Sequence, residues 1–267
     1  DFALLFNEQS DKVTFNSFNE YEYDTFNFEF YFNWQDLSST EDWSYLVSHG
    51  TDINNIAMLI EIHNDGRLFT SWNEEELSSS AHSVISGIER NIWYHYRLIY
   101  DGQTAFIYLN DELVDSLDKL TPNIINSDLY VGQRGNNSYE FNGMLADLKF
   151  CNNNSQNCSD YFINTDFNIG DPSILYDYSD NQNHGIIDGA EWVEYIKGCT
   201  DTNAFNYNAD ADFNDNSCIY DPFIFNQSQN QAFYYIETAT IDNEDLEAND
   251  WIGAFKGDVC VGARKWD

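Results

Sequence analysis

The most constraining feature of this sequence is a strict alternation of apolar and polar side chains between Thr25 and Trp34. The apolar members are Phe26, Phe28, Phe30, Phe32 and Trp34. A period of two is the spacing of a β-strand, in which successive side chains point to opposite faces. The segment therefore predicts a strand with one buried face, and helical periodicity is almost absent elsewhere in the chain.

Shorter runs of the same kind follow along the chain. They lie at Ser44–Ser48, Ile56–Ile62, Leu68–Trp72, Ile92–Tyr100, Thr104–Leu109, Leu129–Gly132, Met144–Phe150, Ala232–Ala239, Trp251–Phe255 and Val259–Ala263. Turn residues separate consecutive runs, at Asn64-Asp65-Gly66, Asp101-Gly102 and Lys256-Gly257-Asp258. Short strands at regular spacing predict an all-β, antiparallel sandwich.

The charge of the chain limits its partners. There are 46 acidic and 11 basic residues, for a formal net charge of −35. Binding to nucleic acid or to an anionic membrane would be opposed electrostatically, so we expect neither. No run of 18 apolar residues is present, so no membrane insertion by a helix is expected. The acidity fits either a surface adapted to salt or carboxylate clusters that bind divalent cations.

Five cysteines point to an oxidising compartment. Cys151 with Cys158, and Cys199 with Cys218, each bracket a short polar loop that has no hydrophobic core to close it. We expect these two disulfides and an extracellular, secreted or cell-surface location. Cys260 is left over, so we expect it to be a free thiol or to pair outside this chain.

Several segments occur in the order found in one known family. They are Ala3-Leu-Leu-Phe-Asn, Asp11-Lys-Val-Thr-Phe, Trp93–Val114, Leu129-Tyr-Val-Gly, Phe141–Phe150 and Tyr176–Gly185. Together they resemble a laminin-G-like domain of the concanavalin A-like jelly-roll type over residues 1–196. The resemblance implies a two-sheet jelly roll, commonly with bound calcium. It does not imply a ligand, because such domains differ widely in function.

The twenty residues from Cys199 to Cys218 resemble a second family. They are similar to the C-T-D-P-x-A-x-N-Y-N-P-x-A-x-x-D-D-G-S-C repeat of bacterial secreted and surface proteins, with Thr202 and Ala209 in place of its prolines. The resemblance implies an acidic connector clamped by a disulfide. The segment Ala248–Arg264 is similar to sequences that accompany such repeats.

The acidic connector is the first candidate calcium site. Oxygen-bearing side chains suit Ca²⁺, which takes six to eight oxygen ligands. The candidate ligands are Asp201, Asp210, Asp212, Asn214, Asp215 and Asp221. An EF-hand is excluded, because Asp215 stands where that loop needs glycine and Asp221 where it needs a bidentate Glu. The alternative is a loop of Asx turns whose acids are solvated.

The second candidate calcium site lies in the jelly roll. Asp177, Asp180, Asn181 and Asn183 place oxygen-bearing side chains within one tight turn. They could hold one Ca²⁺ ion or could hydrogen-bond the backbone of their own loop. His184 is expected to be a structural hydrogen-bonding residue, because Ca²⁺ prefers oxygen ligands.

No pattern of residues indicates catalysis. Glycosidases need paired carboxylates, and Glu61-Ile-His63 has the alternation of one strand face without the second carboxylate. The nucleophile, zincin and phosphate-loop motifs are absent from the sequence. We therefore expect a protein that is not an enzyme and has no catalytic residues.

Two further features bear on ligand binding. Tyrosines with the potential to stack on sugars are Tyr21, Tyr23, Tyr31, Tyr94 and Tyr139, although strand alternation favours burial for many of them. The alternative is that they pack in the core or along strand edges. Candidate glycosylation sequons lie at Asn136, Asn153, Asn157 and Asn226.

Three parts are expected: a jelly roll at 1–196, a disulfide-clamped connector at 197–221 and a partial β-domain at 222–267. The sequence favours a non-catalytic extracellular adhesion protein, stabilised by calcium, that binds a carbohydrate or protein ligand. The alternative is a structural subunit of an extracellular fibre or surface layer. The unpaired Cys260 and the incomplete last domain keep that alternative open, since open strand edges pair with other chains.

Overall fold

The computed structural model describes most of the chain. The described residues are 1–8, 10–18, 22, 24–35, 42–52, 55–72, 82–118, 125–135, 138–153, 158–165, 167, 171–221, 223, 225, 236–257 and 259–266. They form two compact units, Asp1–Ile196 and Lys197–Asp267. Within them, no helix has the length and apolar character needed to cross a membrane.

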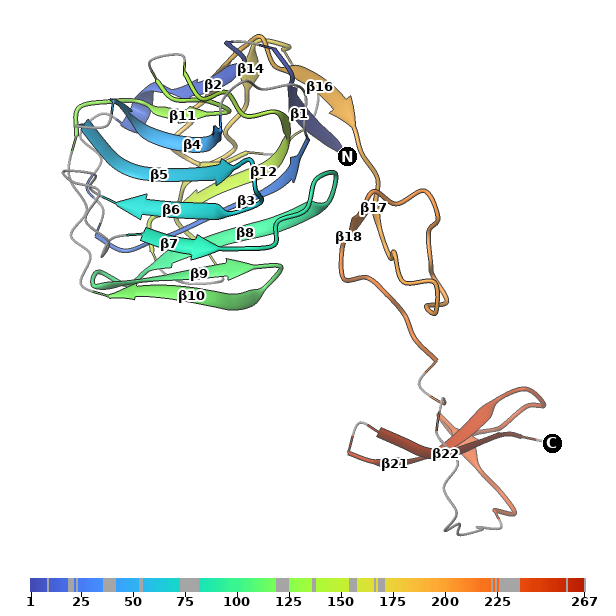
Figure 1. Ribbon diagram of the computed structural model, residues 1–267. Coiled ribbons are helices and arrows are strands. Elements are labelled where there is room, and N and C mark those ends of the chain that lie inside the picture. The colour runs from blue at the N-terminus through green and yellow to red at the C-terminus, as the bar shows by residue number, and fades with distance from the viewer. Residues whose placement is uncertain are drawn as a thin grey trace. The chain divides into compact units, whose positions relative to one another are not determined.

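The first unit is a sandwich of two antiparallel sheets, as the alternation predicts (Figure 1). The first sheet has the order β10 (Glu112–Asp118), β9 (Thr104–Leu109), β8 (Trp93–Tyr100), β3 (Phe26–Trp34), β12 (Gly143–Cys151), β1 (Phe2–Phe6) and β16 (Glu191–Glu194), with β13 (Tyr161–Asn164) paired to β12. The second has the order β14 (Ile174–Leu175), β15 (Gly185–Asp188), β2 (Lys12–Phe15), β11 (Leu129–Val131), β4 (Trp43–Asp52), β5 (Asn55–His63), β6 (Leu68–Trp72) and β7 (His82–Ile85). A short 3₁₀ helix, Asn16–Phe18, follows β2.

The core between the sheets is built on the alternating strand β3. The side chains of Phe26, Phe28, Phe30 and Phe32 are fully buried. Phe30 packs against Tyr96 of the neighbouring strand β8, with ring centroids 5.2 Å apart. Aromatic side chains bury a large apolar area each, so this row provides much of the hydrophobic stabilisation of the sandwich.

The expectation that β3 has a single buried face is incomplete. Asn27 and Asn33, on the opposite face from the phenylalanines, are also buried. The reason is that β3 lies in the middle of its sheet, between β8 and β12. Neighbouring long side chains such as Arg97 and Lys149 extend over that face, where their ion pairs with Asp111 and Glu29 are found.

Turn geometry follows the sequence signals. Asn64-Asp65-Gly66 joins β5 to β6, and Asp101-Gly102 lies between β8 and β9. Asn110 and Asp111 join β9 to β10 with φ of 50° and 65°. Two consecutive positive φ values define the mirror-image turn that matches strand twist, which Asn and Asp tolerate. Asn110-Asp111 therefore forms the hairpin without the glycine that such turns often contain.

The second unit contains only small sheets in its described residues. They are β17 (Lys197–Gly198) with β18 (Phe213–Asn214), β19 (Thr240–Ile241) with β20 (Glu244–Asp245), and β21 (Trp251–Lys256) with β22 (Val259–Lys265). The first pair is parallel. Residues 236–239 of the strand predicted at Ala232–Ala239 form no strand, and the remainder of that prediction lies outside the described residues. Asp258 of the last predicted turn is outside them too.

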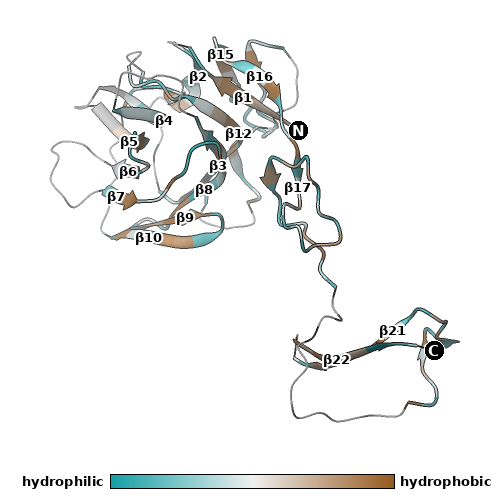
Figure 2. Cartoon of the chain, turned by 45° about the vertical axis from the view of Figure 1, so that its right-hand side comes forward, coloured by the Kyte–Doolittle hydropathy of each residue, from teal (hydrophilic) through white to brown (hydrophobic). Residues whose placement is uncertain are grey.

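Both predicted disulfides are present. Cys151 is bonded to Cys158, and Cys199 to Cys218. Cys260 is a free thiol and is buried. The segment closed by Cys199–Cys218 is coloured largely as hydrophilic in Figure 2. The covalent bond therefore holds a segment with little apolar surface of its own to bury.

Candidate functional site

The outer face of the second sheet is the candidate site. The contact of Thr70 identifies the inner face of this sheet, because its hydroxyl lies 2.7 Å from the hydroxyl of Tyr96 in the other sheet. Thr70 therefore faces inward, and its neighbour Phe69 on β6 faces outward. Phe69 lies opposite Glu61 of β5, and Glu61 opposite Tyr45 of β4. Directly paired residues share a face, so all three belong to the outer surface.

Aromatic rings gather on this face. Trp43 of β4 lies opposite His63 of β5. Its ring is 4.9 Å from that of Phe69 and 4.7 Å from that of His63, both edge to face. The side chains of Trp43, His63 and Phe69 are each partly exposed. The edge-to-face contacts hold the three rings in place while leaving aromatic surface open to solvent.

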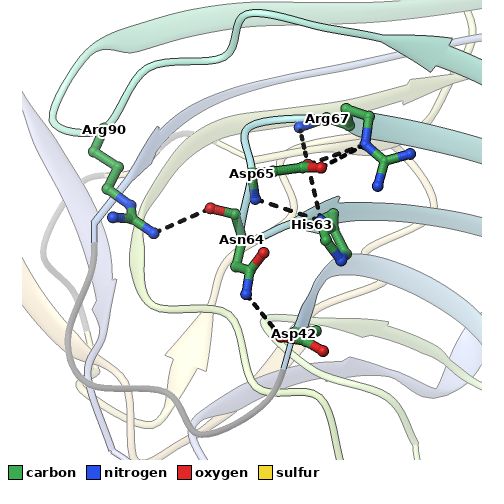
Figure 3. Close-up of polar contacts among 6 residues, drawn as sticks. All are labelled: Asp42, His63, Asn64, Asp65, Arg67 and Arg90. Carbon is green, nitrogen blue, oxygen red and sulfur yellow. Dashed lines mark hydrogen bonds and ion pairs between the residues drawn. The ribbon is translucent and has the colours of Figure 1, made fainter.

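The turn between β5 and β6, next to His63 and Phe69 in the chain, is held by several polar contacts (Figure 3). The Asp65 carboxylate accepts two bonds from Nε of Arg67, at 3.0 and 2.8 Å, and one of its oxygens is 2.8 Å from Nδ1 of His63. Slight burial raises the pKa of Asp65, but the bonds from His63 and Arg67 outweigh it and hold that pKa below its usual value. Asp65 therefore stays ionised and holds the Arg67 side chain, whose guanidinium carbon is 5.3 Å from the Phe69 ring centroid.

The turn is anchored on both sides. The Asn64 side chain donates to the Asp42 carboxylate at 2.7 Å, and its backbone N–H donates to the Asp42 carbonyl at 2.9 Å. From the other side, Arg90 donates to the Asn64 carbonyl at 3.2 Å while lying over the ring of Trp34. These contacts arise from segments far apart in sequence, so only the folded sheet brings them together.

Gly66 is needed for this arrangement. Its φ is +82°, a region that L-residues rarely adopt. A Cβ atom at Gly66 would lie 2.5 Å from the carbonyl oxygen of Ile88, and the Gly66 carbonyl accepts a bond from the Ile88 N–H at 3.0 Å. The close approach of the loop containing Ile88 thus depends on the missing side chain.

The predicted calcium residues of the jelly roll serve their own loop. The Asp177 carboxylate accepts bonds from the backbone N–H groups of Asn164, Ser179 and Asn183, at 2.7–2.9 Å. The amides of Asn181 and Asn183 donate to carbonyls of β13 at 2.8 Å. Asp180 is exposed in the same turn.

The hydrogen-bonding role expected for His184 is found in this turn. Its Nδ1 accepts the N–H of Asp177 at 3.1 Å. The turn residues therefore hold the chain against β13.

The predicted calcium residues of the acidic connector make similar local bonds. Asp201 accepts the N–H of Asn203 and the hydroxyl of Tyr220. Oxygens of Asn214, Asp215 and Asp221 each accept the N–H of the residue two positions later. Asp210 and Asp212 lie in the same segment, at the turn before β18. These contacts are the Asx turns of the alternative interpretation.

Among the described carboxylates, imidazoles and thiols, no three lie close enough together to hold a metal ion. The predicted asparagine ligands are not part of this set of groups. Calcium binding stays a prediction for both segments.

The remaining candidates fall in several environments. Tyr94 is buried, and Tyr31 and Tyr139 are partly exposed. Asn153 is partly exposed after β12. Tyr21, Tyr23, Asn136, Asn157 and Asn226 lie outside the described residues.

Sequence reasoning missed the residues that define the outer face, namely Trp43, Phe69, Arg67 and Arg90. Trp43 could have been found from its alternation with Tyr45, which places both side chains on one strand face. The predicted strand began at Ser44 and so left Trp43 out, whereas β4 begins at Trp43. No local pattern marks Arg90, because its contacts are made across the fold.

Comparison with known proteins agrees with the architecture. Residues 7–155 match the family model of the concanavalin A-like lectin/glucanases superfamily. This match spans more than half of the chain, and the chain therefore belongs to that superfamily. No curated protein matches the chain.

Solved structures share the fold at low sequence identity. A putative carbohydrate binding protein from Bacteroides ovatus aligns with a TM-score of 0.50 and 14% identity, covering 72% of this chain and 59% of that one. The chain thus spans about three fifths of that relative's length. A heptameric SAP-like pentraxin from Limulus polyphemus aligns with a TM-score of 0.46 and 17% identity, covering 58% of this chain and 78% of that one. These likenesses concern the fold alone.

Proposed function

We propose that this chain is a non-catalytic carbohydrate-binding module of an extracellular or cell-surface protein, acting in adhesion. The observation that carries the proposal is the outer face of β4–β6, where partly exposed rings of Trp43 and Phe69 adjoin the fixed polar turn at Asn64, Asp65 and Arg67. Sugar rings stack their apolar faces on aromatic side chains, while their hydroxyls need prearranged donors and acceptors. This face offers both.

Two observations support the non-catalytic and extracellular parts of the proposal. Glycoside hydrolysis uses two carboxylates flanking the scissile bond. Glu61 is the one carboxylate among the described side chains of the strands β4, β5 and β6, and it is only 7% exposed. The Asp65 carboxylate in the adjoining turn is already bound by Arg67 and His63. Two disulfides fit an oxidising compartment outside the cytoplasm.

A glycan array followed by calorimetry on the full chain tests the proposal. Trp43→Ala removes the largest ring of the site and is expected to weaken binding of the retained glycan at least about tenfold, since aromatic contacts dominate such interfaces. Tyr178→Ala is the matched control, because Tyr178 is an exposed aromatic outside this face. Absence of any retained glycan, or unchanged affinity in Trp43→Ala, would contradict the proposal.

A second candidate function, self-assembly into a fibre or layer, is favoured by one observation in the second unit. The hairpin β21–β22 exposes four apolar side chains: Trp251, Phe255, Val259 and Val261. Its two strands pair only with each other among the described residues. Apolar strands with open edges invite pairing with another copy of the chain. Light scattering that shows a monomer at all concentrations would exclude this candidate.

A further inference from the structure

Arg134 is a buried cation that forms no ion pair among the described residues. It follows β11, is 6% exposed, and donates its backbone N–H to the Ser138 carbonyl at 3.1 Å. Its guanidinium carbon is 5.5 Å from the ring centroid of Tyr45 and 5.8 Å from that of Tyr139. Two side-chain nitrogens, Nε and Nη2, are buried and have no hydrogen-bond partner.

This situation is unusual for a chain so rich in carboxylates. Arg67 has Asp65 at 2.8 Å, and Arg97 has Asp111 at 3.5 Å. The ion pairs found among the described residues do not include Arg134, and its Nε and Nη2 have no hydrogen-bond partner. A guanidinium is always charged in proteins, and burying a charge without a partner is costly. Cation–π contacts with two tyrosines offset only part of that cost.

The two unpartnered nitrogens have a specific geometry. Nε–H and the adjacent Nη2–H lie on the same edge of the planar guanidinium and point in parallel. This pair is the fork that binds the two oxygens of a carboxylate or a sulfate. The unsatisfied edge of Arg134 is therefore shaped for an oxyanion.

The surroundings of Arg134 belong to the candidate sugar site. Tyr45 and Leu59 form a buried cluster on the outer face, and Trp43 and Tyr139 both pack against it. Tyr139 is partly exposed, and its ring is stacked on Tyr45 with centroids 4.9 Å apart. Its φ of +61° is rare for a bulky residue, and the bond from the Tyr45 N–H to the Tyr139 carbonyl, at 2.8 Å, holds it there. Arg134 and Trp43 thus flank one aromatic cluster.

We propose that Arg134 is the anion-binding residue of this face and that the module recognises acidic saccharides. The sugar ring stacks on the exposed aromatic surface, and its carboxylate or sulfate accepts two hydrogen bonds from Nε and Nη2 of Arg134. This inference rests on the proposed carbohydrate-binding function and specifies its ligand class.

The test compares oligosaccharides that differ only in charge. Trigalacturonate is titrated against its methyl ester, and a sulfated galactose trisaccharide against its desulfated form, by calorimetry on the full chain at 150 mM salt. We expect the wild type to bind one acidic form at least tenfold more tightly than its neutral counterpart. The arm that shows the preference identifies the oxyanion as carboxylate or sulfate.

Variants assign the preference to the guanidinium. Arg134→Met keeps an apolar stem on the tyrosines and is expected to abolish the preference for the acidic form. Arg134→Lys keeps the charge but lacks the two parallel N–H groups. In this variant the logarithm of the affinity ratio, acidic over neutral, is expected to fall below half of the wild-type value. Lys256→Met, an exposed residue of the second unit, removes one charge elsewhere and should leave the preference intact.

Two results separate the proposals. Equal affinity of the wild type for acidic and neutral sugars would overturn the role of Arg134 and leave carbohydrate binding standing. The same holds if folded Arg134→Met keeps the preference. Binding of neither form, in both arms and on the glycan array, would contradict the proposed function itself. The wild-type comparison decides the ligand class even if Arg134→Met does not fold.

Discussion

The imidazole Nε2 of His49 lies 3.1 Å from the backbone carbonyl oxygen of Ser127, and the side chain of His49 is fully buried between the sheets and the 3₁₀ helix residue Phe18. Burial lowers the pKa of His49 to about 4, although hydrogen bonds to backbone carbonyls of Ser127 and Phe18 act in the opposite direction. Between about pH 4 and pH 6.5, His49 is therefore neutral in the folded protein but protonated in the unfolded chain.

This pKa predicts a loss of stability in mild acid. The unfolded chain takes up the proton near pH 6.5 and the folded protein only near pH 4, so the free energy of unfolding falls as the pH drops through that window. The total loss is about 3 kcal/mol at 1.36 kcal/mol per pKa unit. Urea unfolding at pH 7, 5.5 and 4.5 should show a weaker pH dependence in His49→Gln than in the wild type. Identical slopes in the two proteins would contradict the assignment.

The hydroxyls of Thr70 and Tyr96 predict an energetic coupling between the two sheets. Thr70→Val leaves the buried phenol of Tyr96 without its partner at 2.7 Å. An unsatisfied buried polar group costs about 1–3 kcal/mol, so this variant should be destabilised by that amount. The double variant with Tyr96→Phe should be less destabilised than the sum of the two single variants. Strict additivity in denaturant unfolding would argue against a shared hydrogen bond.

Gly66 and Gly87 provide a matched pair for testing the polar turn. Both have positive φ, but a Cβ at Gly66 meets the Ile88 carbonyl at 2.5 Å, whereas nothing lies within 4 Å at Gly87. Gly87→Ala should lose only about 1 kcal/mol from backbone strain. Gly66→Ala should lose more and weaken glycan binding, because the turn holding Asn64, Asp65 and Arg67 must shift. Equal effects of the two substitutions on stability and binding would refute this role.

Asp177 is expected to be important as a hydrogen-bond acceptor with or without calcium. Its two oxygens accept four bonds, from Asn164, Ser179 and Asn183. Asp177→Asn turns one acceptor into a donor that faces other donors, which should cost about 2–3 kcal/mol. The same loss is expected in EDTA and in 1 mM calcium if the carboxylate serves only its own loop. A loss that vanishes in EDTA would instead indicate that Asp177 binds the ion.

The calcium prediction is tested on the wild type in the same way. An ion that binds only the native protein raises its melting temperature, so EDTA should lower that temperature and calcium should restore it. Asp210→Asn with Asp212→Asn should remove the effect if the acidic connector is the site. A melting temperature that does not respond to EDTA would end the calcium prediction for both segments.

The local pattern of this sequence predicted many of the longer strands, several turns and both disulfides, but it missed β7 and β10 and placed a strand at residues 236–239, where none forms. Alternation in β3, the Asn64-Asp65-Gly66 turn and the pairing of Cys199 with Cys218 depend on neighbours within a few residues, or on a loop with no other means of closure. Such features are set by backbone sterics and by side-chain period, which are visible along the chain.

Tertiary structure alone decided the candidate site. Arg90 meets Asn64 only because the loop before β8 packs on the β5–β6 turn, and Arg134 lies over Tyr45 only because β11 pairs with β4. The sequence shows 46 acidic residues but does not show which cation forms no ion pair among the described residues. Whether a buried charge is neutralised depends on distances of a few ångströms between segments far apart in the chain, and those distances exist only once the sheets have formed.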